Sequence, residues 1–112
     1  MQISDKEKLI KICLINNNAI FDYPWKDSRY KDIPVFRNKH NKKWYALIFE
    51  LNNKVYVNLK CKPEDSWILQ DQYDFITPAW HMNKKHWIKV ETEKAPLDLL
   101  KTLIKNSFDL IK

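Results

Sequence analysis

Glycine is missing from this chain of 112 residues. Motifs that use glycine to bring the backbone close to a phosphate group are therefore absent, among them the P-loop and the dinucleotide-binding G-x-G-x-x-G. The nucleophile elbow and the EF-hand calcium loop also need glycine and are excluded with them. Because asparagine tolerates positive φ, we expect it to make the turns instead, at 16–18, 41 and 52–53. The lack of glycine argues against the common phosphate-cradling nucleotide enzymes.

Long apolar runs are also lacking. No stretch of about 18 apolar residues occurs, so we expect no membrane-spanning helix. The N-terminal residues alternate between charged and apolar side chains and contain no apolar signal-peptide core. This pattern predicts a cytoplasmic protein that does not associate with membranes.

Paired metal ligands and catalytic motifs are scarce as well. Cys13 and Cys61 stand alone, so neither a C-x-x-C metal motif nor a disulfide is expected. His81 and His86 are five positions apart, which suits neither one helix face nor one strand face. No motif supports a Ser/His/Asp or Cys/His set. We therefore expect no metal, no cofactor and no enzymatic activity.

Aromatic and basic residues, in contrast, are plentiful. Five Trp, five Tyr and five Phe within a hydrophobic content of 45% indicate one folded domain over residues 1–112. Twenty Lys and Arg against fourteen Asp and Glu give a net charge of +6. A basic balance suggests an anionic partner, nucleic acid first. An A/T-rich genome, which favours Lys, Asn and Ile codons, is the alternative explanation of the bulk charge.

The basic residues are clustered along the chain. Residues 37–62 carry seven basic residues against one acidic residue, and residues 81–89 carry three lysines and no acid. The four acids of residues 63–80 lie between these two segments. Codon bias would spread charge evenly, so the clustering indicates a basic surface. The alternative is a solvated, lysine-rich hairpin face that protects edge strands from aggregation.

The first half of the chain reads as a helix followed by three strands. Ser4 and Glu7 form a capping box that predicts a helix to about Asn16. Residues 19–34 contain two prolines and predict a loop or an irregular edge. Strands are expected at 35–40, 43–51 and 54–60, the second central with two apolar faces, the third with one wet face. Asn52-Asn53 predicts a two-residue hairpin turn.

The second half reads as helix, two extended segments and helix. Pro63 opens a helix that Trp67, Ile68 and Leu69 are expected to anchor, with its acidic residues on a solvated face. Residues 75–80 and 87–92 are predicted to be extended. Pro96 opens a final helix with one buried stripe, formed by Leu100, Leu103, Ile104, Ser107, Phe108 and Ile111. The order predicts a two-layer α+β fold, α-β(3)-α-β(2)-α, with helices packed on one face of an antiparallel sheet.

The segment 81–87, His-Met-Asn-Lys-Lys-His-Trp, resembles the His-Leu-Asn-Lys-x-His-Trp stretch of the MmcQ/YjbR family. Further segments are similar in order, namely Tyr23-Pro24, Val35-Phe36, 44–47, 58–64 and Ser107-Phe108. One departure is His40-Asn41-Lys42, where the family often has glycine. The resemblance implies an α-β(3)-α-β(2)-α fold similar to CyaY and to type III secretion chaperones. It also implies a bacterial DNA-binding role with a double-wing arrangement.

A nucleic-acid site would combine two segments. Phosphates would be contacted along one or two β-wings by Arg37, Lys39, Lys42, Lys43 and Lys54. The second segment would contribute His81, Asn83, Lys84, Lys85, His86 and Trp87, with the lysines on phosphates, the rings stacked on an unpaired base and the asparagine on a base edge. The alternative is structural: Trp87 belongs to the core, and His81 and Asn83 lock the loop through backbone hydrogen bonds.

A protein-interaction module of the chaperone type, without catalytic activity, is the alternative function. It is suggested by the fold resemblance and by aromatic residues that we expect to be exposed, Trp25, Tyr30 and Tyr56. Such a module would form a dimer or add a peptide to a sheet edge. For either function we expect a monomer or a weak dimer.

Overall fold

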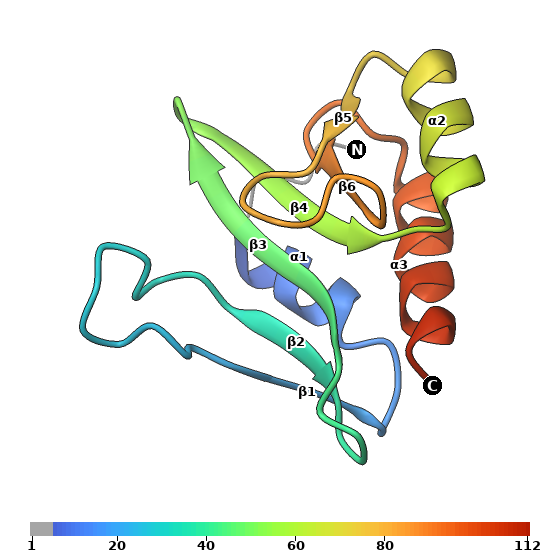
Figure 1. Cartoon of the computed structure of the whole chain (residues 1–112). Coiled ribbons are helices and arrows are strands. Elements are labelled where there is room, and N and C mark those ends of the chain that lie inside the picture. Colours follow the sequence, from blue (N-terminus) through green and yellow to red (C-terminus); the bar gives the residue numbers. More distant parts are fainter. Residues whose placement is uncertain (1–5) are drawn as a thin grey trace.

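Residues 6–112 are described by the computed structural model, and within them an antiparallel sheet of six strands carries three helices on one side (Figure 1). The strand order in the sheet is β1-β2-β3-β4-β6-β5. The elements are, in chain order, α1 (Lys6–Cys13), β1 (Ala19–Asp22), β2 (Val35–Asn38), β3 (Trp44–Leu51), β4 (Lys54–Lys60), α2 (Pro63–Gln72), β5 (Ile76–Pro78), β6 (Trp87–Glu91) and α3 (Leu97–Leu110). The capping box at Ser4 lies outside the described residues. None of the helices described is long and apolar enough to cross a bilayer.

The predicted α+β class is confirmed, with one strand more than expected. Residues 19–22 form β1, which pairs with β2 in the register Phe21↔Phe36, so the order is α-β(4)-α-β(2)-α. This strand has four residues between an asparagine run and Pro24, too short for a period-2 pattern to stand out. Its position is nevertheless the predicted one, because β1 is an edge strand.

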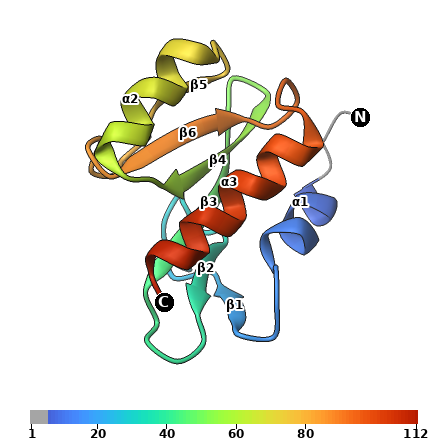
Figure 2. The ribbon, with the colours of Figure 1, turned by 90° about the vertical axis from the view of Figure 1, so that its right-hand side faces the viewer.

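Helix α3 crosses the sheet diagonally, with α1 beside it (Figure 2). All six residues of its predicted stripe are buried. Ser107 fixes the helix to the sheet, since its Oγ donates to Tyr45 O at 2.6 Å and accepts from Lys60 N at 2.8 Å. Tyr45 in turn donates its hydroxyl to Cys13 O at 2.6 Å, which links β3 to α1.

The predicted anchor of α2 is wrong. Trp67 and Ile68 are 77% and 52% exposed, Leu69 is half-buried, and the buried residue of this helix is Ser66. Consecutive residues point about 100° apart around a helix, so three adjacent apolar side chains cannot share one buried face. The acidic residues of the segment, Glu64, Asp65, Asp71 and Asp74, are exposed as expected.

Apolar side chains pack on both sides of the sheet. On the helix side, α1 and α3 cover the residues of β3, β4 and β6. On the opposite side, which we call the loop side, the loops 23–34 and 79–86 cover a second cluster rich in aromatic rings. The two-sided burial predicted for 43–51 is confirmed. The wet face predicted for 54–60 is wrong, because the loops bury Asn58 completely and Tyr56 in part.

The turns show how the chain manages without glycine. Asn52 and Asn53 have φ of 53° and 65°, which confirms the predicted two-residue turn. In the β2–β3 turn Lys42, not Asn41, takes the left-handed conformation, with φ of 63°. The run 16–18 uses a side chain instead of positive φ, since Asn16 Oδ1 accepts from Asn18 N at 2.8 Å.

Candidate nucleic-acid interface

The loop 79–86 is fixed to the loop side at its start by Asn58 of β4. Asn58 Nδ2 donates to Trp80 O at 2.7 Å, and Asn58 Oδ1 accepts from Trp80 N at 3.3 Å. The Trp80 ring also stacks on Phe49, with 4.4 Å between centroids and 22° between planes. The beginning of the loop is therefore held against the centre of the sheet by two hydrogen bonds and one ring stack.

The second half of the loop 79–86 is held by hydrogen bonds to main-chain groups. Asn83 Oδ1 accepts from Lys85 N at 2.9 Å, and Asn83 O accepts from His86 N at 3.1 Å. His86 O accepts from Cys61 N at 2.8 Å. Trp87 begins β6 and is 7% exposed within the loop-side cluster. Asn83 and Trp87 thus hold the loop in place. The residues exposed to solvent are His81, Asn83, Lys84, Lys85 and His86.

His81 stands in the left-handed region, with φ of 56°. Its ring contacts the edges of Trp80 and Tyr30, with centroids 4.3 Å and 5.9 Å away. A residue with a Cβ in this conformation costs about 1–2 kcal/mol relative to the right-handed region. The exposed imidazole is therefore held at a definite place between the two loops.

Within residues 6–112, two cations of the strands lie over aromatic rings on the loop side. The guanidinium of Arg37 is 5.2 Å from the Trp44 ring centroid and pairs with Asp22 at 2.9 Å. Lys89 Nζ is 4.9 Å from the Tyr56 ring centroid. Lys89 was not among the predicted residues. Its alternation with the apolar residues Ile88 and Val90 nevertheless indicates that it lies on the opposite side of β6 from them. Lys89 adds a cation to the predicted basic surface, which already included Arg37.

The strand register places most of the predicted cations at one end of the sheet. Arg37 pairs with Trp44, Ala46 with Leu59, and Lys60 with Trp87, so the β2–β3 turn and the loop 84–86 share that end. The turn itself is braced, because Asn41 Nδ2 donates to Ile111 O at 2.7 Å. Three exposed lysines project from this end on the turn, Lys39, Lys42 and Lys43.

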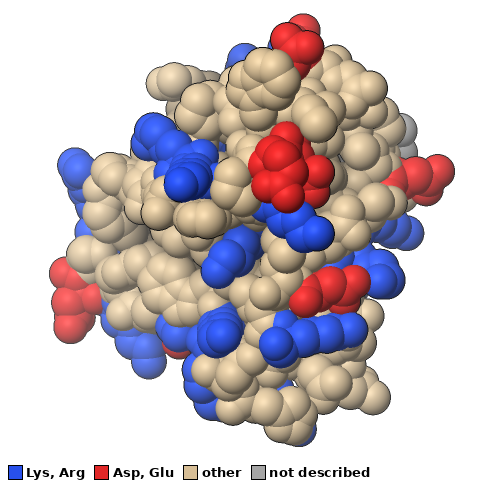
Figure 3. Space-filling model, turned by 45° about the vertical axis from the view of Figure 1, so that its right-hand side comes forward, with Lys and Arg blue, Asp and Glu red and all other residues tan. Residues whose placement is uncertain are grey.

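Lys54 does not join this group. It follows the β3–β4 turn, at the other end of the eight-residue strand β3, which is about 26 Å long at about 3.3 Å per residue. Its Nζ lies 3.9 Å from Glu91 Oε1. On the face seen in Figure 3, lysine and arginine side chains lie next to acidic ones, so charge of one sign does not cover it. The basic region is therefore defined by where the lysines lie on the sheet, and not by the net charge of the protein.

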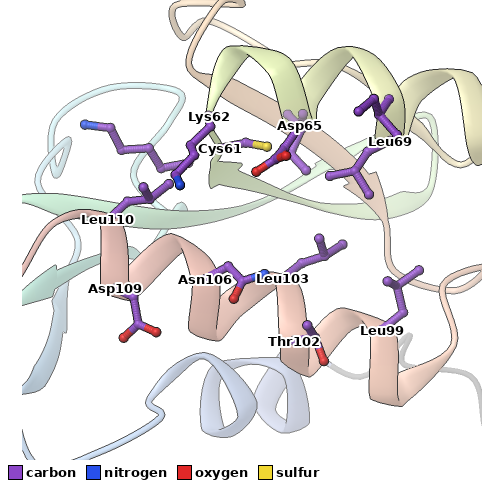
Figure 4. A pocket seen from close by; sticks show the side chains of 13 residues that line it. Cys61, Lys62, Asp65, Leu69, Leu99, Thr102, Leu103, Asn106, Asp109 and Leu110 are labelled. Atoms are coloured by element: carbon purple, nitrogen blue, oxygen red, sulfur yellow. The ribbon is translucent and has the colours of Figure 1, made fainter.

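A groove of about 660 Å³ runs between α2 and α3 on the helix side (Figure 4). Leu69, Leu99, Leu103 and Leu110 line it, together with Cys61 and Asp65. Burial, with smaller contributions from Asp65 and Glu64, raises the pKa of the Cys61 thiol to about 11. At neutral pH this thiol is therefore protonated and a poor nucleophile. Within residues 6–112, no three or more His, Cys, Asp or Glu side chains are grouped to hold a metal ion.

The six-stranded sheet, with helices on one side and two aromatic loops on the other, defines the architectural class of this α+β protein. The chain belongs to the YjbR family, whose model matches residues 17–110. The resemblance seen in the sequence is thereby confirmed.

Relatives and solved structures agree with this assignment. The uncharacterized protein YyaQ of Bacillus subtilis (strain 168) is 38% identical over 102 residues, which cover 81% of this chain and 84% of YyaQ. The uncharacterized protein YbdF of Escherichia coli O157:H7 is 41% identical over 70 residues, or 62% of this chain and 57% of YbdF. The crystal structure of a Pseudomonas syringae protein superposes with a TM-score of 0.82 at 29% identity, covering 96% of this chain and 99% of that one. A Deinococcus radiodurans protein with the domain DUF419 gives a TM-score of 0.78 at 26% identity, covering 99% and 82%.

Proposed function

We propose that the protein is a cytoplasmic, non-catalytic DNA-binding protein that contacts phosphates with the loop side of its sheet. The observation that carries the proposal is the placement of cations and aromatic rings together on the loop side, which no helix of residues 6–112 covers. Arg37 lies over Trp44, Lys89 lies over Tyr56, and Lys84 and Lys85 project from the loop above them.

In this arrangement the lysines act as point charges on phosphates, and release of counterions drives association. The β2–β3 turn and the loop 79–86 would be the two wings, since both lie at the same end of the sheet. Lys39, Lys42 and Lys43 on the first wing extend the contact beyond Lys84 and Lys85 on the second. Trp87 supports the second wing from below, and Lys54 lies too far away to contact the same phosphates.

The test is a titration of fluorescent duplex and single-stranded oligonucleotides at two salt concentrations, read by anisotropy. Binding should weaken steeply with salt, with a slope of roughly −0.9 per phosphate contacted in duplex DNA. The double variant Lys84→Glu/Lys85→Glu should lose at least about tenfold in affinity. No binding of either oligonucleotide at low salt would overturn the proposal.

The matched control is Lys8→Glu/Lys101→Glu, which changes the net charge equally. Both lysines are exposed, and they lie on α1 and α3 on the opposite side of the sheet. Its affinity for the oligonucleotides should stay within about twofold of wild type, because distant exposed charges are screened by salt. Equal losses in both double variants would show that net charge, not the loop side, governs binding.

A protein-docking role is the second candidate, favoured by the exposure of Trp67 and Ile68 beside the α2–α3 groove. The aromatic residues that first suggested this role, Trp25, Tyr30 and Tyr56, are half-buried in the loop-side cluster, contrary to expectation. Light scattering after size-exclusion chromatography tests self-association through α2. A concentration-dependent dimer that Trp67→Ser/Ile68→Ser abolishes would support this role, and a monomer at every concentration would exclude self-docking.

A further inference from the structure

A second cavity, of about 490 Å³, lies where the two loops meet the end of β3. Its volume falls in the range of small-molecule sites. The cavity lies on a different part of the surface from Lys84 and Lys85, which do not line it. Its polar and aromatic lining comes from four separate segments, as Lys6, Arg29, Tyr30, Asp32, Glu50, Trp80 and His81.

The lining combines three kinds of chemistry. Tyr30 and Trp80 supply aromatic surface, and their centroids are 5.7 Å apart in an edge-to-face arrangement. Arg29 supplies a guanidinium 5.0 Å from the Tyr30 ring centroid, and its Nη2 donates to Tyr30 Oη at 2.8 Å. Asp32 and Glu50 add carboxylates to the same cavity. A ligand that fits must therefore offer a flat ring, an anionic group and hydrogen-bond donors at once.

We propose that this cavity binds one unstacked nucleotide of a single strand. The base would pack against Tyr30 and Trp80, its amino groups would donate to Glu50 and Asp32, and its phosphate would accept from Arg29 and His81. The choice of ligand class rests on the proposed DNA-binding function. The cavity makes that function more specific, because a base within a duplex cannot enter it without being flipped out of the stack.

The backbone of His81 is the second observation that points to this cavity. Its left-handed conformation places an exposed imidazole at the cavity, where glycine would be less strained. Left-handed residues with a Cβ persist where the surrounding structure holds them, and they cluster at ligand-binding sites. Asn58 provides that support one residue earlier through its two bonds to Trp80.

The experiment measures binding of nucleoside 5′-monophosphates to the full chain by tryptophan fluorescence, since Trp80 lines the cavity. Wild type should show saturable quenching that adenosine, guanosine or cytidine monophosphate produces and inorganic phosphate does not. His81→Gly and Arg29→Gln should each weaken binding about tenfold, the effect of one charge-assisted hydrogen bond. Lys8→Glu/Lys101→Glu serves as the unaffected control.

Several outcomes separate this inference from the function on which it rests. Oligonucleotide binding without mononucleotide binding would overturn the cavity proposal and leave DNA binding standing. Mononucleotide binding without oligonucleotide binding would support the cavity and contradict the DNA-binding surface. Because glycine relieves strain at position 81, His81→Gly should melt no lower than wild type, so its loss of binding would not reflect unfolding. Unchanged binding in both variants would overturn the inference.

Discussion

The side-chain amide of Asn58 hydrogen-bonds the main chain of Trp80 in both directions, at 2.7 Å through Nδ2 and at 3.3 Å through Oδ1. Asn58 thereby gives Trp80 the pair of main-chain hydrogen bonds that a neighbouring strand would otherwise supply. Because Asn58 is fully buried, water does not replace these bonds when they are lost. One side chain of β4 thus determines where Trp80 and His81 lie on the loop side.

Replacing this amide should destabilise the protein. Asn58→Ala removes both bonds and leaves main-chain polar groups of the partly buried Trp80 without this partner, so the free energy of unfolding should fall by about 1–3 kcal/mol. Urea denaturation measures the change, and near-UV circular dichroism should show altered packing of Trp80. Asn106→Ala, at an exposed position of α3, is the matched control and should change stability by less than about 0.5 kcal/mol. A similar small change in Asn58→Ala would contradict the anchoring role.

Ser107 should contribute to stability through its two bonds to the sheet. Ser107→Ala leaves Tyr45 O and Lys60 N without this partner and should lower the free energy of unfolding by about 1–2 kcal/mol. Thr102→Ala is the control, because Thr102 donates to Asp98 O within α3 at an exposed position. Equal urea midpoints for these two variants would show that the buried link does not hold α3 to the sheet.

The left-handed turn residue Lys42 offers a stabilising substitution. Lys42→Gly removes the steric cost of a Cβ at φ of 63° and should raise the free energy of unfolding by up to about 1 kcal/mol. Lys43→Gly is the comparison, because Lys43 lies next to it without positive φ and should lose about 0.5–1 kcal/mol. Thermal melts of the two variants should therefore shift in opposite directions.

Cysteine burial should make stability depend on alkaline pH. The Cys61 pKa is raised to about 11 in the fold, chiefly by burial, whereas an unfolded thiol ionises near its ordinary pKa of 9.0. Between these values the folded state binds more protons than the unfolded state, so the free energy of unfolding falls as pH rises. Melting temperatures from pH 8 to 11 should decline less steeply in Cys61→Ala than in wild type. Parallel declines would show that the Cys61 thiol does not contribute.

Local sequence patterns predicted the elements that have a strong period or a distinctive turn. The α3 stripe repeats along the whole helix, and Asn52-Asn53 joins two runs rich in aromatic and aliphatic residues, so short-range physics is sufficient there. Strand β1 was missed because four residues carry too little pattern. The predicted anchor of α2 is wrong because apolar side chains at 67 and 68 do not imply burial, and helical geometry points them to solvent.

Only part of the candidate site could be predicted from the sequence. The lysines at 84 and 85 were identified because charge clusters are local. Asn58 and Trp80 are 22 residues apart, and no spacing rule connects an asparagine in a strand to a distant loop. The wet face predicted for β4 followed from alternation alone, which does not reveal that two loops cover the sheet. The second cavity was missed for the same reason, since its lining comes from four separate segments.

Strand β4 joins two parts of the sheet, one that precedes α2 in the sequence and one that follows it. Strands β1 to β4 form a meander in which each pairs with the next, whereas β6 and β5 follow α2 and meet the described meander along β4. The β2–β3 and β3–β4 loops are short and close with little entropic cost, so this part of the meander should assemble first. During synthesis on the ribosome, the chain would therefore expose an unpaired β4 edge until residues 63–112 have emerged. That interval is when the nascent protein is most prone to associate with another chain.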